Sequence, residues 1–207
     1  MRRALPSWSV LVGVGVSIGA AGAPAGCTRD AAPALCPDVV AGELVVSELR
    51  GEQTGSDSQG QWIELYNASG TELDLLGLRV LWRRLDGSDS DTVLVRRSLL
   101  VAPDGYVVLG AGLDADRPSY VDYGVAGDLP GAIMPSAAVD LIACDVLIDR
   151  LTYSGLTRTG TYSLGPTPPT ADGNDVSTAW CNNETVDGTG LAAPGTPGAA
   201  NPPCPTL

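Results

Sequence analysis

The side chains of this 207-residue chain that could do chemistry are almost all carboxylates. The sequence contains 24 Asp and Glu residues and 12 basic residues, all of them arginine, with no lysine and no histidine. Without histidine, Ser-His-Asp and Cys-His catalysis and histidine-containing zinc sites are excluded. Without lysine, Ser-Lys catalysis and Schiff-base formation are excluded as well. Paired carboxylates are the chemistry that remains, and we predict that the protein has no catalytic residues and is not an enzyme.

One run of acids has the composition of a cation site. Asp86, Asp89 and Asp91 alternate with small residues in Asp-Gly-Ser-Asp-Ser-Asp. Calcium takes roughly six to eight oxygen ligands, and a turn of this kind supplies several. The run lacks the spacing of an EF-hand loop and its terminal Glu. We expect an exposed acidic hairpin loop and no cofactor, with a calcium site as the alternative.

The beginning of the chain has the three-part pattern of a signal peptide. Residues 1–8 carry Arg2 and Arg3 and no acid, residues 9–23 carry no charge, and small residues follow up to Cys27. This pattern predicts a signal peptide over residues 1–26 and an exported protein. The uncharged run is shorter than the ~20 apolar residues of a membrane-spanning helix and is rich in glycine, which argues against an anchor.

Two fates of the mature N-terminus remain open. The segment Pro-Ala-Gly-Cys at residues 24–27 resembles the lipobox of bacterial lipoproteins, in which the cysteine becomes acylated. Pro24 departs from that pattern, because an aliphatic residue usually stands there. With Cys27 lipidated, the protein would be held in the outer membrane or periplasm. Ordinary cleavage after Ala23 or Ala25 would make it a secreted protein instead.

The cysteine count bears on the same question. An odd number in an exported protein leaves one thiol to explain, and the five are Cys27, Cys36, Cys144, Cys181 and Cys204. If Cys27 is lipidated, four remain, and four cysteines allow three connectivities. We predict the disulfides Cys36–Cys204, which would tie the two ends of the domain, and Cys144–Cys181. Without a Cys-x-x-Cys pair or a histidine, a structural zinc site is not expected.

The charge of the chain restricts its partners. Removal of residues 1–26 leaves 10 arginines against 24 acids, a net charge of −14. Such a surface repels nucleic acid and anionic lipid headgroups. We therefore expect an unknown protein or glycan partner at the cell surface and no nucleic acid. Contact with a membrane is expected only through an N-terminal lipid, and the protein is expected to be a monomer.

The mature chain is predicted to be a single all-β domain. Residues 27–41 are rich in Ala and Pro and indicate a spacer or tether, and residues 42–204 are long enough for one domain with its own core. Short β-type runs separated by turn residues, without a convincing helical stretch, indicate a β-sandwich or barrel. The expected strands are 43–50, 61–66, 78–83, 92–95, 106–110, 139–144, 146–153 and 162–164, and the segment after 165 is expected to be largely irregular.

Several of these strands occur within longer stretches of a recognisable pattern. The stretches are LVVSEL at 44–49, QWIELYN at 61–67, LDLLGL at 73–78, LVAPDGYVVL at 100–109, VDLI at 139–142 and GTPGAAN at 195–201. In their order and spacing they resemble the lamin tail domain family, in its bacterial exported form. The resemblance covers residues 42–201. It implies an immunoglobulin-like β-sandwich and a binding or scaffolding role rather than catalysis.

Glu64 is the acid to consider first for chemistry, because it lies in the second of these stretches. A solvated or arginine-paired strand residue is the expectation we favour for it over a catalytic acid.

The main functional hypothesis is a non-catalytic interaction or scaffolding domain of the cell envelope or exterior. The alternative is a carbohydrate-binding or adhesin module, assisted by calcium at the acidic run. That alternative requires aromatic side chains exposed on one sheet face, and the candidates are Trp62, Tyr66, Tyr120, Tyr123 and Trp180.

Overall fold

The computed structural model describes residues 35–129, 131–165, 167–186 and 194–205. The predicted signal peptide, residues 1–26, and the candidate lipidation site Cys27 lie outside the described residues. Within the described part of the chain, no helix has the length and apolar character needed to cross a membrane.

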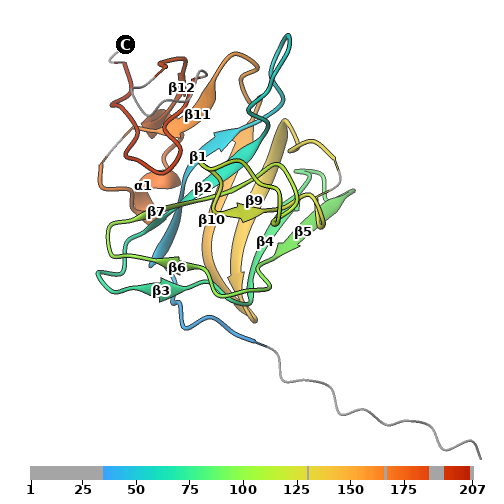
Figure 1. Cartoon of the computed structure of the whole chain (residues 1–207). Helices are drawn as coiled ribbons and strands as arrows, with labels where there is room; N and C mark the ends of the chain where they lie inside the picture. Colours follow the sequence, from blue (N-terminus) through green and yellow to red (C-terminus); the bar gives the residue numbers. More distant parts are fainter. Residues whose placement is uncertain (1–34, 130, 166, 187–193, 206–207) are drawn as a thin grey trace, which may run out of the picture. The chain divides into compact units, whose positions relative to one another are not determined.

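The larger of two main sheets has six strands (Figure 1). Neighbouring strands pair antiparallel, except that β7 and β8 are parallel. In spatial order the strands are β12 (Trp180–Asn183), β11 (Thr161–Leu164), β1 (Leu44–Arg50), β2 (Trp62–Asn67), β7 (Tyr106–Gly110) and β8 (Tyr123–Gly124).

The second sheet is fully antiparallel and has four strands. Their order is β10 (Val146–Ser154), β9 (Ser136–Ala143), β4 (Leu78–Arg83) and β5 (Ser90–Leu94). The short strands β3 (Leu73–Asp74) and β6 (Leu100–Val101) form a separate pair, and a four-residue helix α1 (Ala171–Asn174) precedes a 3-10 turn, Ser177–Ala179. The chain is thus mostly β, as predicted, with helix confined to these short pieces.

Both main sheets contribute to one apolar core. In β4 the alternation predicted from the sequence is confirmed, because Leu78, Val80 and Trp82 are buried and the intervening side chains are half-buried. From the six-stranded sheet, Ile63 and Leu65 join the same cluster. Period-two alternation places one side of each strand in a shared core, which is how two sheets bury their apolar faces.

Strands β1 and β2 depart from this alternation, since every residue in both is buried. Their outer face is therefore covered as well. Trp62 lies on that face, in a small second cluster with Val108 and Val121.

The two disulfides are Cys36–Cys144 and Cys181–Cys204, so the predicted connectivity is wrong although all four cysteines are paired. Cys144 follows β9 of the four-stranded sheet, whereas Cys181 lies in β12 at the edge of the other sheet. The Cα–Cα distances of the observed pairs, 5.4 and 5.7 Å, are within bridging range. The order of the strands in space decides which cysteines meet. That order cannot be read from the number of residues between the cysteines along the chain.

The first disulfide also changes the predicted spacer. Cys36 is bonded to Cys144 at the end of β9, and Val39 is buried in the main core. The last part of the 27–41 segment therefore belongs to the folded domain.

Candidate functional site

Two glutamates on neighbouring strands form the most unusual polar site of the described residues. Glu48 in β1 and Glu64 in β2 are directly opposite in the antiparallel register, and neither side chain is exposed to solvent. Directly opposite residues in a sheet point to the same face. Two carboxylates thus lie side by side under cover, although buried acids are rare unless they are paired or hydrogen-bonded.

A β-bulge builds this arrangement. The register of β1 against β2 shifts between Val46 and Glu48, so that Ser47 is the extra residue. Ser47 Oγ donates to Glu64 Oε1 at 2.7 Å, and Glu48 accepts a hydrogen bond from Trp62 Nε1, which lies on the same outer face. A bulge of this kind re-aims a side chain, and here it brings the consecutive residues Ser47 and Glu48 to one face. Simple alternation would have placed them on opposite faces.

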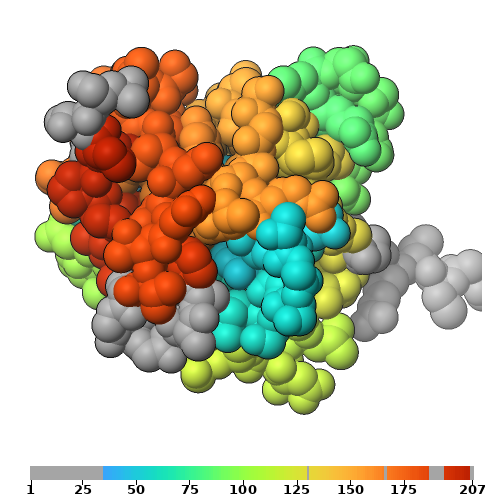
Figure 2. Space-filling view, turned by 90° about the horizontal axis from the view of Figure 1, so that it is seen from above, coloured from blue at the N-terminus to red at the C-terminus, as the bar shows by residue number. Residues whose placement is uncertain are grey.

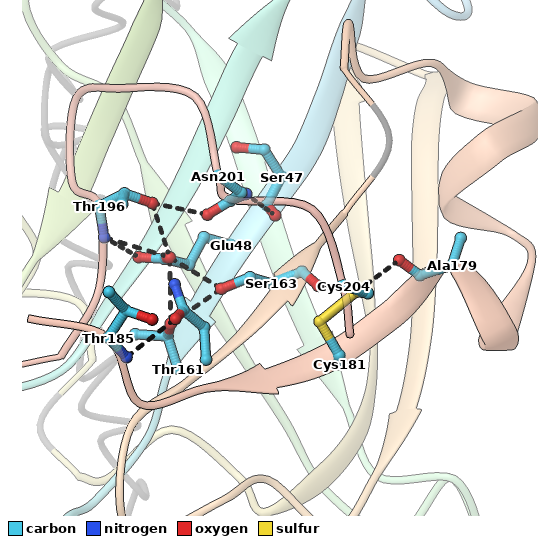
Figure 3. The surroundings of a disulfide bond; sticks show 11 residues. Ser47, Glu48, Thr161, Ser163, Ala179, Cys181, Thr185, Thr196, Asn201 and Cys204 are labelled. Carbon is cyan, nitrogen blue, oxygen red and sulfur yellow. Dashed lines mark hydrogen bonds between the residues drawn. A yellow bond between two sulfur atoms is a disulfide. The ribbon is translucent and has the colours of Figure 1, made fainter. Parts of the chain in front are cut away.

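Glu48 accepts hydrogen bonds from several elements at once (Figure 3). Trp62 Nε1 donates to Oε1 at 3.0 Å, and the hydroxyls of Thr161 and Ser163 in β11 lie 3.1 and 2.9 Å from Oε2. The backbone N–H of Thr196 is 3.4 and 3.3 Å from the two carboxylate oxygens, and its hydroxyl is 3.2 Å from Oε2. The N–H groups of Trp62 and Thr196 and the hydroxyls of β11 provide donors to both carboxylate oxygens, which is the environment that an ionised group needs when it is buried.

The segment that supplies Thr196 covers both acids, and we call residues 194–204 the strap. Gly198 N donates to Glu64 Oε2 at 2.7 Å. Asn201 accepts from the Thr196 hydroxyl at 2.7 Å and donates to the Ser47 carbonyl at 2.9 Å. Figure 3 shows the strap crossing β1 and ending at the disulfide Cys181–Cys204.

Burial dominates the electrostatics of the pair. It raises the pKa of Glu48, against the lowering effect of hydrogen bonds from Ser163, Trp62 and Thr161. It raises the pKa of Glu64 well above the ordinary value, and the nearby charge of Glu48 raises it further. Among the described residues, no ion pair includes either acid. Because Glu48 has more donors than Glu64, we assign the charge to Glu48 and a proton to Glu64.

The expectation of a solvated or arginine-paired Glu64 is therefore wrong. Its side chain is fully buried and bonded to Ser47 and the strap. A catalytic acid must reach substrate, and no part of Glu64 is open to solvent. The two glutamates connect the sheet to the strap through hydrogen bonds. The signal for it in the sequence was that Glu48, Glu64 and the GTPGAAN segment all lie in stretches that carry the family resemblance.

The acidic run expected as a hairpin loop connects β4 and β5. Asp86 Oδ1 accepts from Ser88 N within the turn, and Asp89 lies 3.7 Å from Arg84. Asp91 pairs across the hairpin with Trp82. Among the described residues, no group of three or more acidic, cysteine or histidine side chains converges to hold a metal ion, so the structure does not bring these three aspartates together.

Four of the five aromatic residues proposed for an exposed platform are buried, namely Trp62, Tyr66, Tyr123 and Trp180. Tyr120 is partly buried and packs against the edge of Trp62 with ring centroids 5.6 Å apart. Trp180 stacks on Tyr162 at 4.8 Å. The expectation of an aromatic platform is wrong, because these rings fill the core or the covered outer face.

A polar hollow of about 350 Å³ lies between the loop that follows β1 and the turn before β11. Gln53 joins the two loops, accepting from Gly160 N at 2.8 Å and donating to Gly160 O at 3.0 Å. In Figure 2 the first loop (cyan) and the second (orange) lie side by side on this face. Sequence reasoning missed this hollow, since its walls come from segments about 100 residues apart. The side chains around it include Arg50, Ser56, Asp57, Ser58, Gln59, Arg158 and Thr159.

One wall of the hollow is a fixed ion pair. Asp57 accepts from both terminal nitrogens of Arg50, at 2.9 and 3.1 Å, and the Arg50 guanidinium lies over the Trp62 ring at 5.0 Å. The pKa of Asp57 is lowered by its bonds to Arg50 and to the Gln59 backbone, although burial opposes them. The remaining hydroxyl, amide and guanidinium groups offer both donors and acceptors to a polar ligand.

Comparison with known proteins adds no relative. A scan against models of protein families gives no match, and a search of curated proteins finds none either.

Proposed function

We propose that the domain is an immunoglobulin-like β-sandwich of lamin-tail type. Three stretches support this proposal by their positions in space. LVVSEL lies in β1, QWIELYN includes β2, and GTPGAAN forms most of the strap. Segments separated by up to about 150 residues thus build one unit around Glu48 and Glu64.

We further propose that the protein is a non-catalytic interaction or scaffolding domain. The observation that carries this is the complete burial of Glu48 and Glu64 beneath the strap. They are the strongest candidates for carboxylate chemistry in a chain without histidine or lysine. Their donors belong to the protein itself, so they stabilise the domain rather than act on a substrate.

The proposed compartment is the exterior or the envelope of a bacterial cell. Two disulfides suit an oxidising environment, and all cysteines but Cys27 are used in them. Cys27 is therefore available as the lipid-bearing residue. Intact mass of protein extracted from membranes tests this directly, because an acylated N-terminal cysteine adds the mass of its acyl chains, whereas a secreted form lacks Cys27 or carries it unmodified.

The absence of catalysis is tested with a panel of ester, glycoside and phosphate-ester substrates. We expect the wild-type protein to show no more turnover than Glu64→Gln. Turnover that is lost in Glu64→Gln, in a variant shown to be folded, would overturn the proposal.

A second candidate function is glycan binding, and the polar hollow is the observation that favours it. Its hydroxyl and amide groups could bond a polyhydroxylated ligand even though the aromatic platform is absent. A glycan array probed with wild type, with Gln59→Ala and with Arg158→Ala, each with and without chelator, separates the two functions. Binding that both substitutions abolish supports the glycan function, and no binding by any form removes it.

A further inference from the structure

The strap differs from the rest of the domain in charge. Its eleven residues, PGTPGAANPPC, contain no acidic or basic side chain, whereas the sheet beneath it presents two carboxylates. It is held by hydrogen bonds to Glu48, Glu64 and Ser47 and, at one end, by Cys181–Cys204. Any response of the strap to pH must therefore come from the sheet.

Two buried carboxyl groups that are directly opposite each other favour one proton in the site. Glu64 Oε2 accepts from Gly198 N, which leaves Oε1 facing Ser47 Oγ at 2.7 Å. Protonation of Oε1 reverses this hydrogen bond, so that Glu64 donates to the Ser47 hydroxyl, and Glu48 keeps the single negative charge within its set of donors. Loss of that proton to solvent would leave two like charges on opposing residues with no cation between them.

The surrounding charged groups do not offset a second charge. On β1, Arg50 faces the Trp62 ring and is already paired with Asp57. On β2 and β7, burial raises the pKa of both Tyr66 and Tyr106 to about 12. On β11 the groups that face Glu48 are the Thr161 and Ser163 hydroxyls. The two glutamates are therefore the carboxyl groups whose ionisation changes the charge of this site, and Glu64, whose pKa burial and the charge of Glu48 raise well above its ordinary value, is the second to ionise.

We propose that the strap is a pH-operated cover, which stays closed while Glu64 is protonated and opens from β1 and β2 when Glu64 ionises. Opening admits water to both carboxylates and relieves their repulsion. The disulfide keeps the strap tethered at Cys204, so the motion is reversible and confined to residues before it. The open form exposes the carboxylates and hydroxyls of the outer face.

Hydrogen exchange with the disulfides intact tests the proposal. Protection factors of the strap amides, corrected for intrinsic base catalysis, are compared with rising pH over the range in which the protein stays folded. We expect wild type to lose at least ~10-fold in strap protection over this range, while amides of β9 and β10 stay protected. A ¹³C-carboxyl titration of Glu64 should have its midpoint at the pH where strap protection falls.

Three variants make the test specific. In Glu64→Gln the neutral amide cannot ionise, and strap protection should change less than ~2-fold with pH. In Glu48→Gln the donors face an amide, and the strap should be unprotected at every pH. Asp145→Asn, at a fully exposed acid, should behave as wild type.

Two results would overturn the proposal. One is strap protection that is constant with pH in wild type, or that falls in Glu64→Gln as it does in wild type. The other is loss of protection in β9 and β10 together with the strap, because that would show global unfolding. If Glu64→Gln does not fold, a mismatch between the Glu64 midpoint and the strap transition in wild type has the same consequence.

Discussion

Asp149 joins the two main sheets, and its substitution by Asn gives a quantitative test of the structure. The residue lies in β10 of the four-stranded sheet and is buried. Its Oδ2 accepts from Val46 N in β1 at 2.9 Å and from Asn174 Nδ2 at 2.6 Å. Burial raises its pKa from 3.8 to about 6, despite these hydrogen bonds. The folded state therefore binds this proton more tightly than the unfolded state does.

The sign of the pH dependence follows from that difference. A raised pKa contributes stability below the unfolded value, near pH 4, and the contribution is lost as pH rises through about 6. A difference of about two pKa units at ~1.4 kcal/mol each corresponds to about 3 kcal/mol. Asn cannot ionise. The buried Asn174 Oδ1 has no hydrogen-bond partner among the described residues, and it can turn to accept from the amide that the substitution introduces at position 149. Asp149→Asn should match wild type near pH 4 and be more stable by about 2–3 kcal/mol near pH 7.

Urea unfolding followed by tryptophan fluorescence measures this. The free energy of unfolding of both proteins is determined from about pH 4 to about pH 7, and the difference between them is compared across the range. Asp145→Asn is the control, since its exposed side chain should change stability by less than ~0.5 kcal/mol at any pH. The reasoning would be refuted if the difference in unfolding free energy between wild type and Asp149→Asn changed by less than ~1 kcal/mol over this pH range.

Three further predictions concern the joints of the domain. The double substitution Cys36→Ser/Cys144→Ser opens a loop of 108 residues and should lower the free energy of unfolding by about 5 kcal/mol. Cys181→Ser/Cys204→Ser opens a loop of 23 residues and should lower it by about 3 kcal/mol. Peptide mapping under non-reducing conditions should find these two linkages, and a Cys144–Cys181 peptide would contradict the structure. Asn67→Ala should cost about 2–4 kcal/mol in urea unfolding, because the two N–H groups of the buried Asn67 amide are shared among three carbonyl oxygens at 2.7–3.1 Å. Asn182→Ala, at an exposed site, is its control and should cost little. Gly195→Ala should disturb the strap and shift Trp62 emission, since a Cβ there would lie 2.8 Å from the Trp62 ring. Gly198→Ala, with open space, is its control, and equal effects would exclude the contact as the cause.

Much of the sheet structure could be read from local sequence. Tyr106–Gly110 was predicted with its observed bounds, and Leu78–Arg83 with its bounds and its buried face. Leu78–Arg83 shows period-two alternation because one of its faces lies in the core, whereas Tyr106–Gly110 is a short apolar run with buried residues on both faces. The four paired cysteines could likewise be identified, because cysteines in a chain that is predicted to be exported are expected to form disulfides.

The partners of these residues could not be predicted. Cys36 meets Cys144 because residues 35–36 lie beside Gly77, next to β4, and β4 pairs with β9. The burial of Glu64 depends on a strap more than 130 residues later in the chain. The bulge at Ser47 reverses the face on which alternation along β1 places Glu48. The sequence by itself determined an all-β domain with four bridged cysteines and without histidine or lysine chemistry. Only the tertiary structure decided which acids are buried and which segment covers them. Burial and pKa depend on neighbouring residues, and the order of the strands in space, not the order along the chain, brings those neighbours into contact.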